Sequence, residues 1–162
     1  ARITTFLNPE ADPLGDGWNI TQSLIAIGSG GWVGKGYKAP DSQNALGFLP
    51  HTIVHNDFIF SVMGEQHGFL GGLILICAFA ILFLLMFGIA MQAEDDLGRL
   101  LATGITMLLF THTFMNLGMT ISLTPITGLP LPLVSYGGSF VMITMLSFAL
   151  LQSIWIYRRT LR

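Results

Sequence analysis

Three long apolar runs occupy the second part of the chain, at residues 69–91, 100–123 and 136–157. None of them contains a charged side chain. A helix that crosses the hydrocarbon core of a bilayer needs about 20 predominantly apolar residues, and each run is long enough. The pattern therefore predicts an all-α polytopic membrane protein with three transmembrane helices.

The first 68 residues show a different pattern, in which Gly, Pro and Asp interrupt the apolar positions. Such interruptions are typical of turns. A short helix is expected through residues 22–27, with Asn19 or Thr21 as its cap. Because it is too short to cross a bilayer, its apolar side is expected to lie along the interface. We therefore distinguish a large loop with short interfacial helices, residues 1–68, from a three-helix transmembrane region, residues 69–162.

The two connections between the apolar runs differ in character. Residues 92–99 are charged, whereas residues 124–138 are rich in Pro and Gly and could fold back into the protein as a re-entrant segment. Basic residues flank the first connection and the end of the last run: Arg99, Arg158, Arg159 and Arg162. Three crossings put these arginines on one side, which the positive-inside rule makes cytoplasmic. Residues 1–68 are then extracytoplasmic and the C-terminus is cytoplasmic.

The composition supports a membrane protein. Of the 162 residues, 52% are hydrophobic and 10% are charged, against about 25% charged in soluble domains. With a net charge of −2 and no basic patch, the chain lacks the features of a nucleic-acid-binding protein. Cys77 is the single cysteine and cannot form an internal disulfide. The chain begins without Met and without a signal peptide, so we expect it to be a fragment of a longer protein.

One carboxylate stands at the edge of the first apolar run. If residues 56–66 form a helix, Asp57, Ser61 and Glu65 share one polar stripe while apolar side chains cover the rest. An acid in that place is a candidate for chemistry at the membrane face. The alternative is a helix start, in which Asn56 or Asp57 caps the helix and interacts with its dipole. Spacing alone favours neither interpretation.

Residues 28–38 form a glycine-rich stretch that contains Lys35 and Lys38. It is not a nucleotide-binding P-loop, because the spacing from glycine to lysine is too short and no Ser or Thr follows the lysine. Glycines permit the close approach of a ligand, and the lysines could bind phosphate. The alternative is an interfacial loop in which Trp32 and Tyr37 anchor in the headgroup region.

Two further sets of polar residues are candidates for structure or chemistry. His51, His55 and Asp57 lie close in sequence but match no recognised metal-ligand spacing, so a dedicated zinc site is disfavoured. His112 and Asn116 lie one helical turn apart in the second apolar run. Polar groups at that depth usually face the bundle interior and bond across helices, so a packing role is favoured over a functional one.

Several motifs, in the same order along the chain, resemble the SEDS family (shape, elongation, division and sporulation). The motifs that carry the resemblance are residues 22–31, Gly34-Lys35-Gly36, Ser42-Gln43, Phe48-Leu49-Pro50, Asp57-Phe58-Ile59-Phe60, Gly64-Glu65, Gly68, Asn116-x-Gly118-Met119 and residues 130–139. Residues 8–15 and 26–31 look closer to the RodA elongation branch than to the FtsW division branch. The resemblance covers nearly the whole chain.

The resemblance implies a ten-span protein of the bacterial cytoplasmic (inner) membrane, in which this chain supplies the outer loop after span seven and the last three spans. It implies a peptidoglycan glycosyltransferase that polymerises lipid II into glycan strands during cell elongation and shape maintenance. The implied partners are a class B penicillin-binding protein, other membrane proteins of the elongation machinery and membrane lipid, but no nucleic acid. The fragment alone is expected to be inactive. Two other functions stay open: a lipid II flippase and a non-catalytic membrane scaffold.

By the same resemblance, Asp57 corresponds to the essential outer-loop aspartate of the family and is the candidate catalytic base. The chain departs from the family pattern in having Asn56 for the usual Thr, a longer step without Glu after Leu49-Pro50, and Gln66 where a second Glu is common. Candidate substrate-binding residues are Gln22, Ser29, Lys35, Gln43, Glu65 and Ser135. A divalent cation (Mg²⁺ or Mn²⁺) is a further candidate source of positive charge, with unknown protein ligands.

Overall fold

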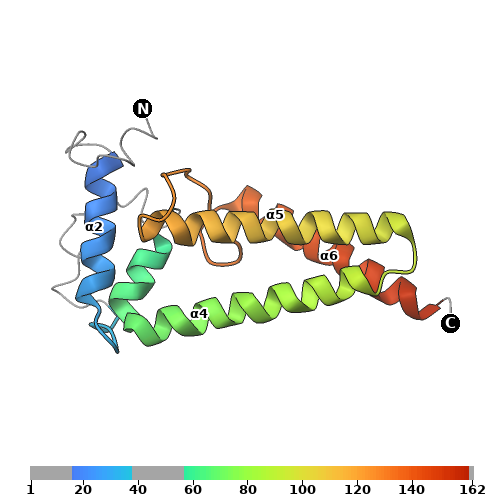
Figure 1. Ribbon diagram of the computed structural model, residues 1–162, viewed down its shortest axis with the longest axis horizontal. Coiled ribbons are helices and arrows are strands. Elements are labelled where there is room, and N and C mark those ends of the chain that lie inside the picture. The colour runs from blue at the N-terminus through green and yellow to red at the C-terminus, as the bar shows by residue number, and fades with distance from the viewer. Residues whose placement is uncertain (1–15, 38–56, 161–162) are drawn as a thin grey trace.

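Helices make up most of the described part of the protein, which is residues 16–37 and 57–160 of the computed structural model (Figure 1). They are α2 (Asp16–Ser29), α4 (Ile59–Met91), α5 (Asp96–Thr120) and α6 (Gly138–Thr160), and the described residues contain no strand. The last three helices are each long and apolar enough to cross a membrane. The prediction of an all-α protein with three membrane-spanning helices is confirmed.

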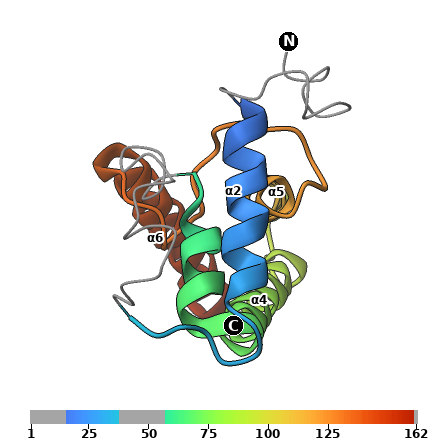
Figure 2. The same ribbon diagram turned by 90° about the vertical axis from the view of Figure 1, so that its left-hand side faces the viewer.

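The three long helices run alongside one another, and α2 lies beside the first turns of α4, across one end of them (Figures 1 and 2). The loop of residues 121–137 lies at the same end, whereas the α4–α5 turn and the C-terminus lie at the other (Figure 1). A small apolar core joins the long helices and consists of Met86, Ala90, Ala102, Leu109 and Leu151. Many other large apolar side chains of these helices face outward, as expected of a surface that meets lipid or further helices.

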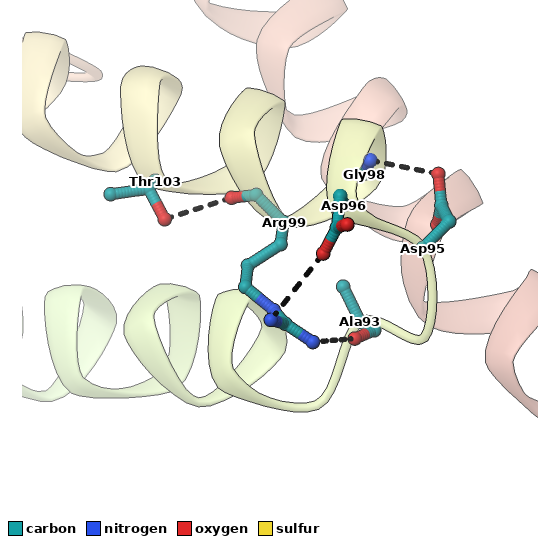
Figure 3. A network of polar contacts seen from close by, with 6 residues as sticks. All are labelled: Ala93, Asp95, Asp96, Gly98, Arg99 and Thr103. Atoms are coloured by element: carbon teal, nitrogen blue, oxygen red, sulfur yellow. Dashed lines mark hydrogen bonds and ion pairs between the residues drawn. The ribbon is translucent and has the colours of Figure 1, made fainter.

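The α4–α5 turn explains why α5 begins before the apolar run that predicted it. Asp95 is the N-cap, and its Oδ2 accepts a hydrogen bond from Gly98 N at 2.8 Å (Figure 3). Arg99 Nη2 donates to Ala93 O at 3.2 Å, and Arg99 Nη1 lies 3.6 Å from Asp96 Oδ1. A capping carboxylate and an acid in the first turn stabilise a helix N-terminus. The charged residues of the turn therefore extend the helix beyond its apolar part.

A sharp break at Gly68 divides α4 into a short helix, residues 59–67, and a long membrane segment, residues 69–91. Gly68 has φ 65° and ψ −163°, a conformation that is essentially restricted to glycine. In an unbroken helix, each N–H bonds the carbonyl four residues earlier. The break therefore interrupts the helical hydrogen bonds that span Gly68, among them those of Phe69 N and Leu70 N and those of Glu65 O and Gln66 O.

The glycine-rich loop, residues 30–36, supplies replacement partners for these groups. It forms four backbone hydrogen bonds across the break: Lys35 N to Glu65 O (2.9 Å), Gly36 N to Gln66 O (3.0 Å), Phe69 N to Gly31 O (2.8 Å) and Leu70 N to Trp32 O (3.2 Å). A Cβ at Gly30, Gly34 or Gly68 would overlap backbone atoms of the facing segment. The glycines therefore permit close packing of the loop on the broken helix.

Helix α2 begins at Asp16, earlier than the helix predicted through residues 22–27. The proposed caps Asn19 and Thr21 lie inside it, so the capping prediction is wrong. Thr21 Oγ1 donates to Gly17 O at 3.0 Å. A hydroxyl that bonds the carbonyl four residues earlier is accommodated within a helix and need not mark its start.

The Ser23 side chain connects α2 to the membrane helices through buried hydrogen bonds. Its Oγ donates to Thr120 O, at the end of α5, at 2.8 Å and lies 2.5 Å from Ser61 Oγ of α4. A hydroxyl has one proton, so Ser23 gives its proton to Thr120 O and accepts the proton of Ser61. All three residues are buried. The contact joins three helices at the end of the bundle where α4 begins.

We expect Ser23→Ala to lower the free energy of unfolding by about 1–3 kcal/mol, because the buried Thr120 carbonyl and Ser61 hydroxyl would lose a partner. Thr21→Ala, at an exposed position of the same helix, is the matched control and should change stability by less than about 0.5 kcal/mol. Unfolding of the full-length protein in detergent measures both variants. Equal stabilities would show that the three-helix contact contributes little.

Candidate functional site

Asp57 lies in a turn just before α4 and is partly buried. The N-cap of α4 is Phe58, and no side chain caps this end of the helix. The alternative in which Asp57 caps the helix is therefore wrong, and Asn56 lies outside the described residues. Because α4 begins at Ile59, Asp57 also lies outside the helix that carries Ser61. The Asp57 carboxylate therefore forms no capping hydrogen bond with the start of α4.

The backbone of Asp57 is fixed by Asn116 of α5. The Asn116 amide nitrogen Nδ2 donates to Asp57 O at 3.0 Å and to Leu129 O at 2.7 Å. Asn116 is fully buried. Gly128 lies so close to the acid that a Cβ at this glycine would be 3.6 Å from Asp57 Oδ2. The carboxylate thus lies against the 121–137 loop, at the junction of that loop with α4 and α5.

Burial raises the pKa of the Asp57 carboxyl above its ordinary value. The cause is desolvation, which disfavours the ionised form. A carboxylate whose pKa is raised accepts a proton more readily than an exposed carboxylate does, and this property suits a general base. The arrangement can therefore receive a proton at a carboxylate whose backbone is held in place.

The 121–137 loop folds back along the end of α5. Leu123 N donates to Gly118 O at 2.8 Å, and Thr124 Oγ1 donates to Met115 O at 3.2 Å. Contacts with protein satisfy these polar groups, as a re-entrant segment requires. The fold-back brings the loop to Asp57, although the Pro-rich stretch lies far from this acid in sequence.

Two non-glycine residues of this loop, Ser122 (φ 58°) and Leu133 (φ 65°), have left-handed backbone angles. Such angles cost about 1–3 kcal/mol each, persist only where surrounding contacts enforce them, and cluster at functional sites. Ser135, a candidate substrate-binding residue, is buried and accepts a hydrogen bond from Leu131 N through its Oγ at 2.8 Å. This contact organises the loop, and a role of Ser135 in binding substrate stays a prediction.

Lys35 and Glu65 form an ion pair between the glycine-rich loop and α4, with Lys35 Nζ 3.2 Å from Glu65 Oε1. The Glu65 side chain is 1% exposed and the Lys35 side chain 27%. A buried carboxylate is tolerated when a charged partner balances it, so the pair reinforces the backbone contacts of the loop with the broken helix. Substrate binding by either residue stays a prediction.

The other candidate residues contribute no contact with Asp57 in the described part of the chain. Gln22 is buried on α2, whereas Ser29 is exposed and donates from its Oγ to Ala26 O at 2.9 Å. Four candidates lie outside the described residues: Lys38, Gln43, His51 and His55. Residues 16–37 and 57–160 contain no group of three or more His, Cys, Asp or Glu side chains that could hold a metal ion. A divalent cation therefore stays a prediction.

Two grooves of the described part lie away from Asp57. One, of about 450 Å³, runs between α4 and α6 and is mainly apolar. The other, of about 300 Å³, is lined by the α4–α5 turn and α6. Neither groove includes Asp57, and the geometry around this acid, not the size of the grooves, identifies the candidate site.

Sequence reasoning missed Asn116 as part of this site. It predicted that His112 and Asn116 bond across helices in a packing role. His112 of α5 does contact α6, where it stacks on Phe140 with ring centroids 5.3 Å apart. Asn116 also bonds other segments, but its partners are backbone carbonyls, one of them that of Asp57. The signal that could have identified Asn116 is the Asn-x-Gly-Met motif, which belongs to the resemblance but received no role there.

Three apolar helices and a partly buried acid held at one end of them define a polytopic membrane protein with a candidate catalytic carboxylate beside its first span. The sequence model of the FtsW/RodA/SpoVE family, described as cell cycle proteins, matches residues 1–160. The chain belongs to this family, and the resemblance to SEDS proteins is confirmed.

Curated relatives cover almost the whole chain. It is 44% identical over 160 residues to peptidoglycan glycosyltransferase MrdB of Escherichia coli K12, which covers 99% of the chain and 42% of that relative. It is 46% identical over 154 residues to peptidoglycan glycosyltransferase RodA of Treponema pallidum, or 94% of the chain and 35% of the relative. The chain thus spans about two fifths of the length of these relatives.

A solved structure shares the helical arrangement. It describes the structural coordination of polymerization and crosslinking by a peptidoglycan synthase complex. One of its chains matches with a TM-score of 0.78 at 29% sequence identity, over 97% of this chain and 41% of that chain. The match supports the overall arrangement of the helices.

Proposed function

We propose that the full-length protein is a peptidoglycan glycosyltransferase that polymerises lipid II, with Asp57 as its general base. The observation that carries this proposal is the position of Asp57, partly buried, held through its backbone by Asn116 and set against Gly128. Relatives named peptidoglycan glycosyltransferases support the same activity. Because the chain spans about two fifths of their length, the activity is proposed for the full-length polypeptide.

The proposed reaction is a glycosyl transfer between two lipid-linked sugars. The 4-hydroxyl oxygen of a GlcNAc unit forms a bond to the anomeric carbon of the other substrate, and the bond from that carbon to the lipid pyrophosphate breaks. The leaving pyrophosphate keeps the bonding electron pair, and the hydroxyl proton passes to the Asp57 carboxylate. A carboxylate cannot ionise an alcohol beforehand, so the proton moves as the new bond forms.

The departing pyrophosphate needs positive charge close to it. Lys35 is the described candidate, and its ammonium is partly exposed while it contacts Glu65. A divalent cation is the other candidate source of this charge. Glu65 is proposed to orient Lys35 and not to act as a second catalytic acid.

The proposed setting is the bacterial inner membrane. We propose that residues 1–68 and 124–135 face outward and that the C-terminus is cytoplasmic, a topology that the positions of the arginines support. Lipid II, a class B penicillin-binding protein and other membrane proteins of the elongation machinery are the proposed substrate and partners. Elongation, and not division, is proposed from residues 8–15 and 26–31. A lipid-linked sugar donor suits this placement, because a substrate that arrives already activated needs no cytoplasmic nucleotide.

The polymerisation rate is expected to fall as the pH is lowered. The fall should occur at a higher pH than that at which an exposed aspartate titrates. The general base must be ionised, and burial raises the pKa of the Asp57 carboxyl. Activity is therefore lost as the pH falls through this raised pKa. The pH dependence of kcat/KM for lipid II measures the effect. An acid limb in the ordinary aspartate range would argue that Asp57 is solvated in the working enzyme.

Lipid II polymerisation in detergent by the full-length protein with its penicillin-binding partner tests the proposal. A detergent micelle has no two sides, so transport produces no signal and only polymerisation yields glycan strands. Asp57→Asn, purified in the same way, controls for a contaminating polymerase. Strands from the wild type alone support the proposal.

The absence of strands from the wild type, with an active family member run alongside, would overturn it. A lipid II flippase would then be identified by transport in sealed vesicles. A scaffold would show neither activity and would still bind the penicillin-binding protein.

A further inference from the structure

Asn116 makes contacts unlike those of the other buried polar residues of α5. Three threonines of this helix donate to carbonyls of their own helix: Thr106 to Ala102, Thr113 to Leu109 and Thr120 to Leu117. Asn116 instead donates to Asp57 O and Leu129 O, which lie 59 and 13 residues away in the chain. Both accepting carbonyls belong to segments that meet at the candidate base.

The two hydrogen bonds use the full donor capacity of one amide group. A side-chain NH₂ has two protons, and Nδ2 lies 3.0 Å from Asp57 O and 2.7 Å from Leu129 O. One nitrogen therefore fixes the separation of the two carbonyls. Because Gly128 directly precedes Leu129, the same nitrogen sets how closely the loop approaches Asp57 Oδ2, which would lie 3.6 Å from a Cβ at Gly128.

Asn116 is fully buried, and its Oδ1 has no hydrogen-bond partner among the described residues. The hydrogen bonds that join Asn116 to other segments are therefore those of its amide nitrogen.

We propose that Asn116 is a positioning residue of the active site, which sets the Asp57 carboxylate against the 121–137 loop through the two hydrogen bonds of one amide nitrogen. The proposal rests on the proposed function, because it assigns to Asn116 the placement of the proposed base. Both hydrogen bonds of Asn116 end on backbone carbonyls, so the residue takes no part in proton transfer.

Two variants of nearly the same shape test the proposal. Asn116→Leu removes both hydrogen-bond donors of the side chain. Asn116→Asp, when its carboxyl is ionised, replaces them with a group that can only accept hydrogen bonds. In the full-length protein with its partner, kcat for lipid II polymerisation is expected to fall by about 10–100-fold, since a displacement of about 1 Å at a reacting group costs about 100-fold. KM should change by less than about threefold, because the lipid II contacts are elsewhere.

The pH profile separates positioning from general loosening of the fold. Release of the loop lets water reach the Asp57 carboxyl, so the acid limb in Asn116→Leu is expected to move to lower pH. Ionisable groups on the elements around Asp57 include Lys35, Glu65, His67, His112 and Tyr136. All five are unchanged in the variant, so a shift between variant and wild type does not come from replacing one of them.

Thr113→Val is the matched control, because it removes a buried polar group from the same helix whose hydrogen bond stays within that helix. It should leave kcat and the acid limb at their wild-type values. The proposal is overturned if the Asn116 variants keep wild-type kcat and pH profile. It is equally overturned if the Asn116 variants lose activity only in proportion to their loss of stability and keep the acid limb of the wild type. That result is expected of a residue with a purely structural role.

Hydrogen exchange distinguishes failure of this proposal from failure of the proposed function. Asn116→Leu should speed amide exchange in residues 121–137 relative to both wild type and Thr113→Val, whether or not Asp57 is the base. Faster exchange together with full activity of Asp57→Asn would remove the base assignment and, with it, the active-site role of Asn116. Unchanged exchange in Asn116→Leu would show that the amide does not hold the loop.

Discussion

Asp57→Asn in the full-length protein is expected to lower lipid II polymerisation by about 10²–10⁴-fold, the usual contribution of a general base. Asparagine keeps the shape of the side chain but cannot accept the proton of the attacking hydroxyl. The hydrogen bond from Asn116 reaches the backbone carbonyl of Asp57, so the substitution leaves it in place. Initial rates of glycan strand formation measure the loss.

Asp57→Glu is the informative companion. It keeps a carboxylate but moves it by one methylene group, and a displacement of about 1 Å costs about 100-fold in rate. Its activity is expected to lie between that of the wild type and that of Asp57→Asn. Wild-type rates in Asp57→Asn would remove Asp57 from the role of base.

Stability should not follow activity in Asp57→Asn. Burial raises the pKa of the Asp57 carboxyl, so the ionised form is less favourable in the folded than in the unfolded state. The contribution of this group to stability is therefore greatest at low pH and is lost as the pH rises through the folded pKa. At neutral pH the neutral amide is expected to leave the unfolding temperature unchanged or to raise it. A lowered unfolding temperature would mean that the carboxylate has a stabilising partner.

Gly68→Ala is expected to have the largest effect on stability, about 3 kcal/mol or more. The angles φ 65° and ψ −163° are strained for alanine. The added Cβ would also overlap backbone atoms of Trp32, Val33 and Gly34, which are not free to move because the four hydrogen bonds across the break hold them. Unfolding in detergent and yield of folded protein measure the loss.

Gly28→Ala is the matched control for this substitution. A Cβ at Gly28 meets no atom within 4 Å, and glycine inside a helix is less stable than alanine by about 0.5–1 kcal/mol. Gly28→Ala is therefore expected to be neutral or slightly stabilising. Similar losses in both variants would show that general packing, and not the conformation of Gly68, decides the outcome.

The apolar runs predicted the number of spans and their approximate ends, because length and hydropathy decide whether a helix crosses a bilayer. They could not predict that α4 begins at Ile59 and is broken at Gly68. The conformation of Gly68 depends on hydrogen bonds with a loop more than 30 residues earlier, and local sequence carries no record of them. The start of α5 was likewise not predicted, because it lies in a charged stretch before the apolar run, where Asp95 caps an additional helical turn.

The acid of the candidate site could be predicted from the sequence, whereas the residues that surround it were harder to predict. Asp57 was a candidate because it stands at the edge of an apolar run, but spacing alone left a helix cap equally open. The family resemblance decided between the two interpretations. Asn116, the partner of Asp57, looked like a packing residue, because spacing along one helix does not show which distant carbonyls an amide reaches. The pairing of Lys35 with Glu65 was hidden for the same reason.

The break at Gly68 also solves a problem of hydrophobic mismatch. A straight α4 of 33 residues would be about 50 Å long at about 1.5 Å per residue, against a hydrocarbon thickness of about 30 Å. Residues 69–91 alone measure about 35 Å, which a modest tilt accommodates. The segment before Gly68 turns aside (Figure 1) and need not enter the lipid. The bend at Gly68 is thereby expected to decide how far Asp57 lies from the hydrocarbon layer. A thicker or thinner membrane should then alter how readily the proposed lipid-linked substrate reaches this acid.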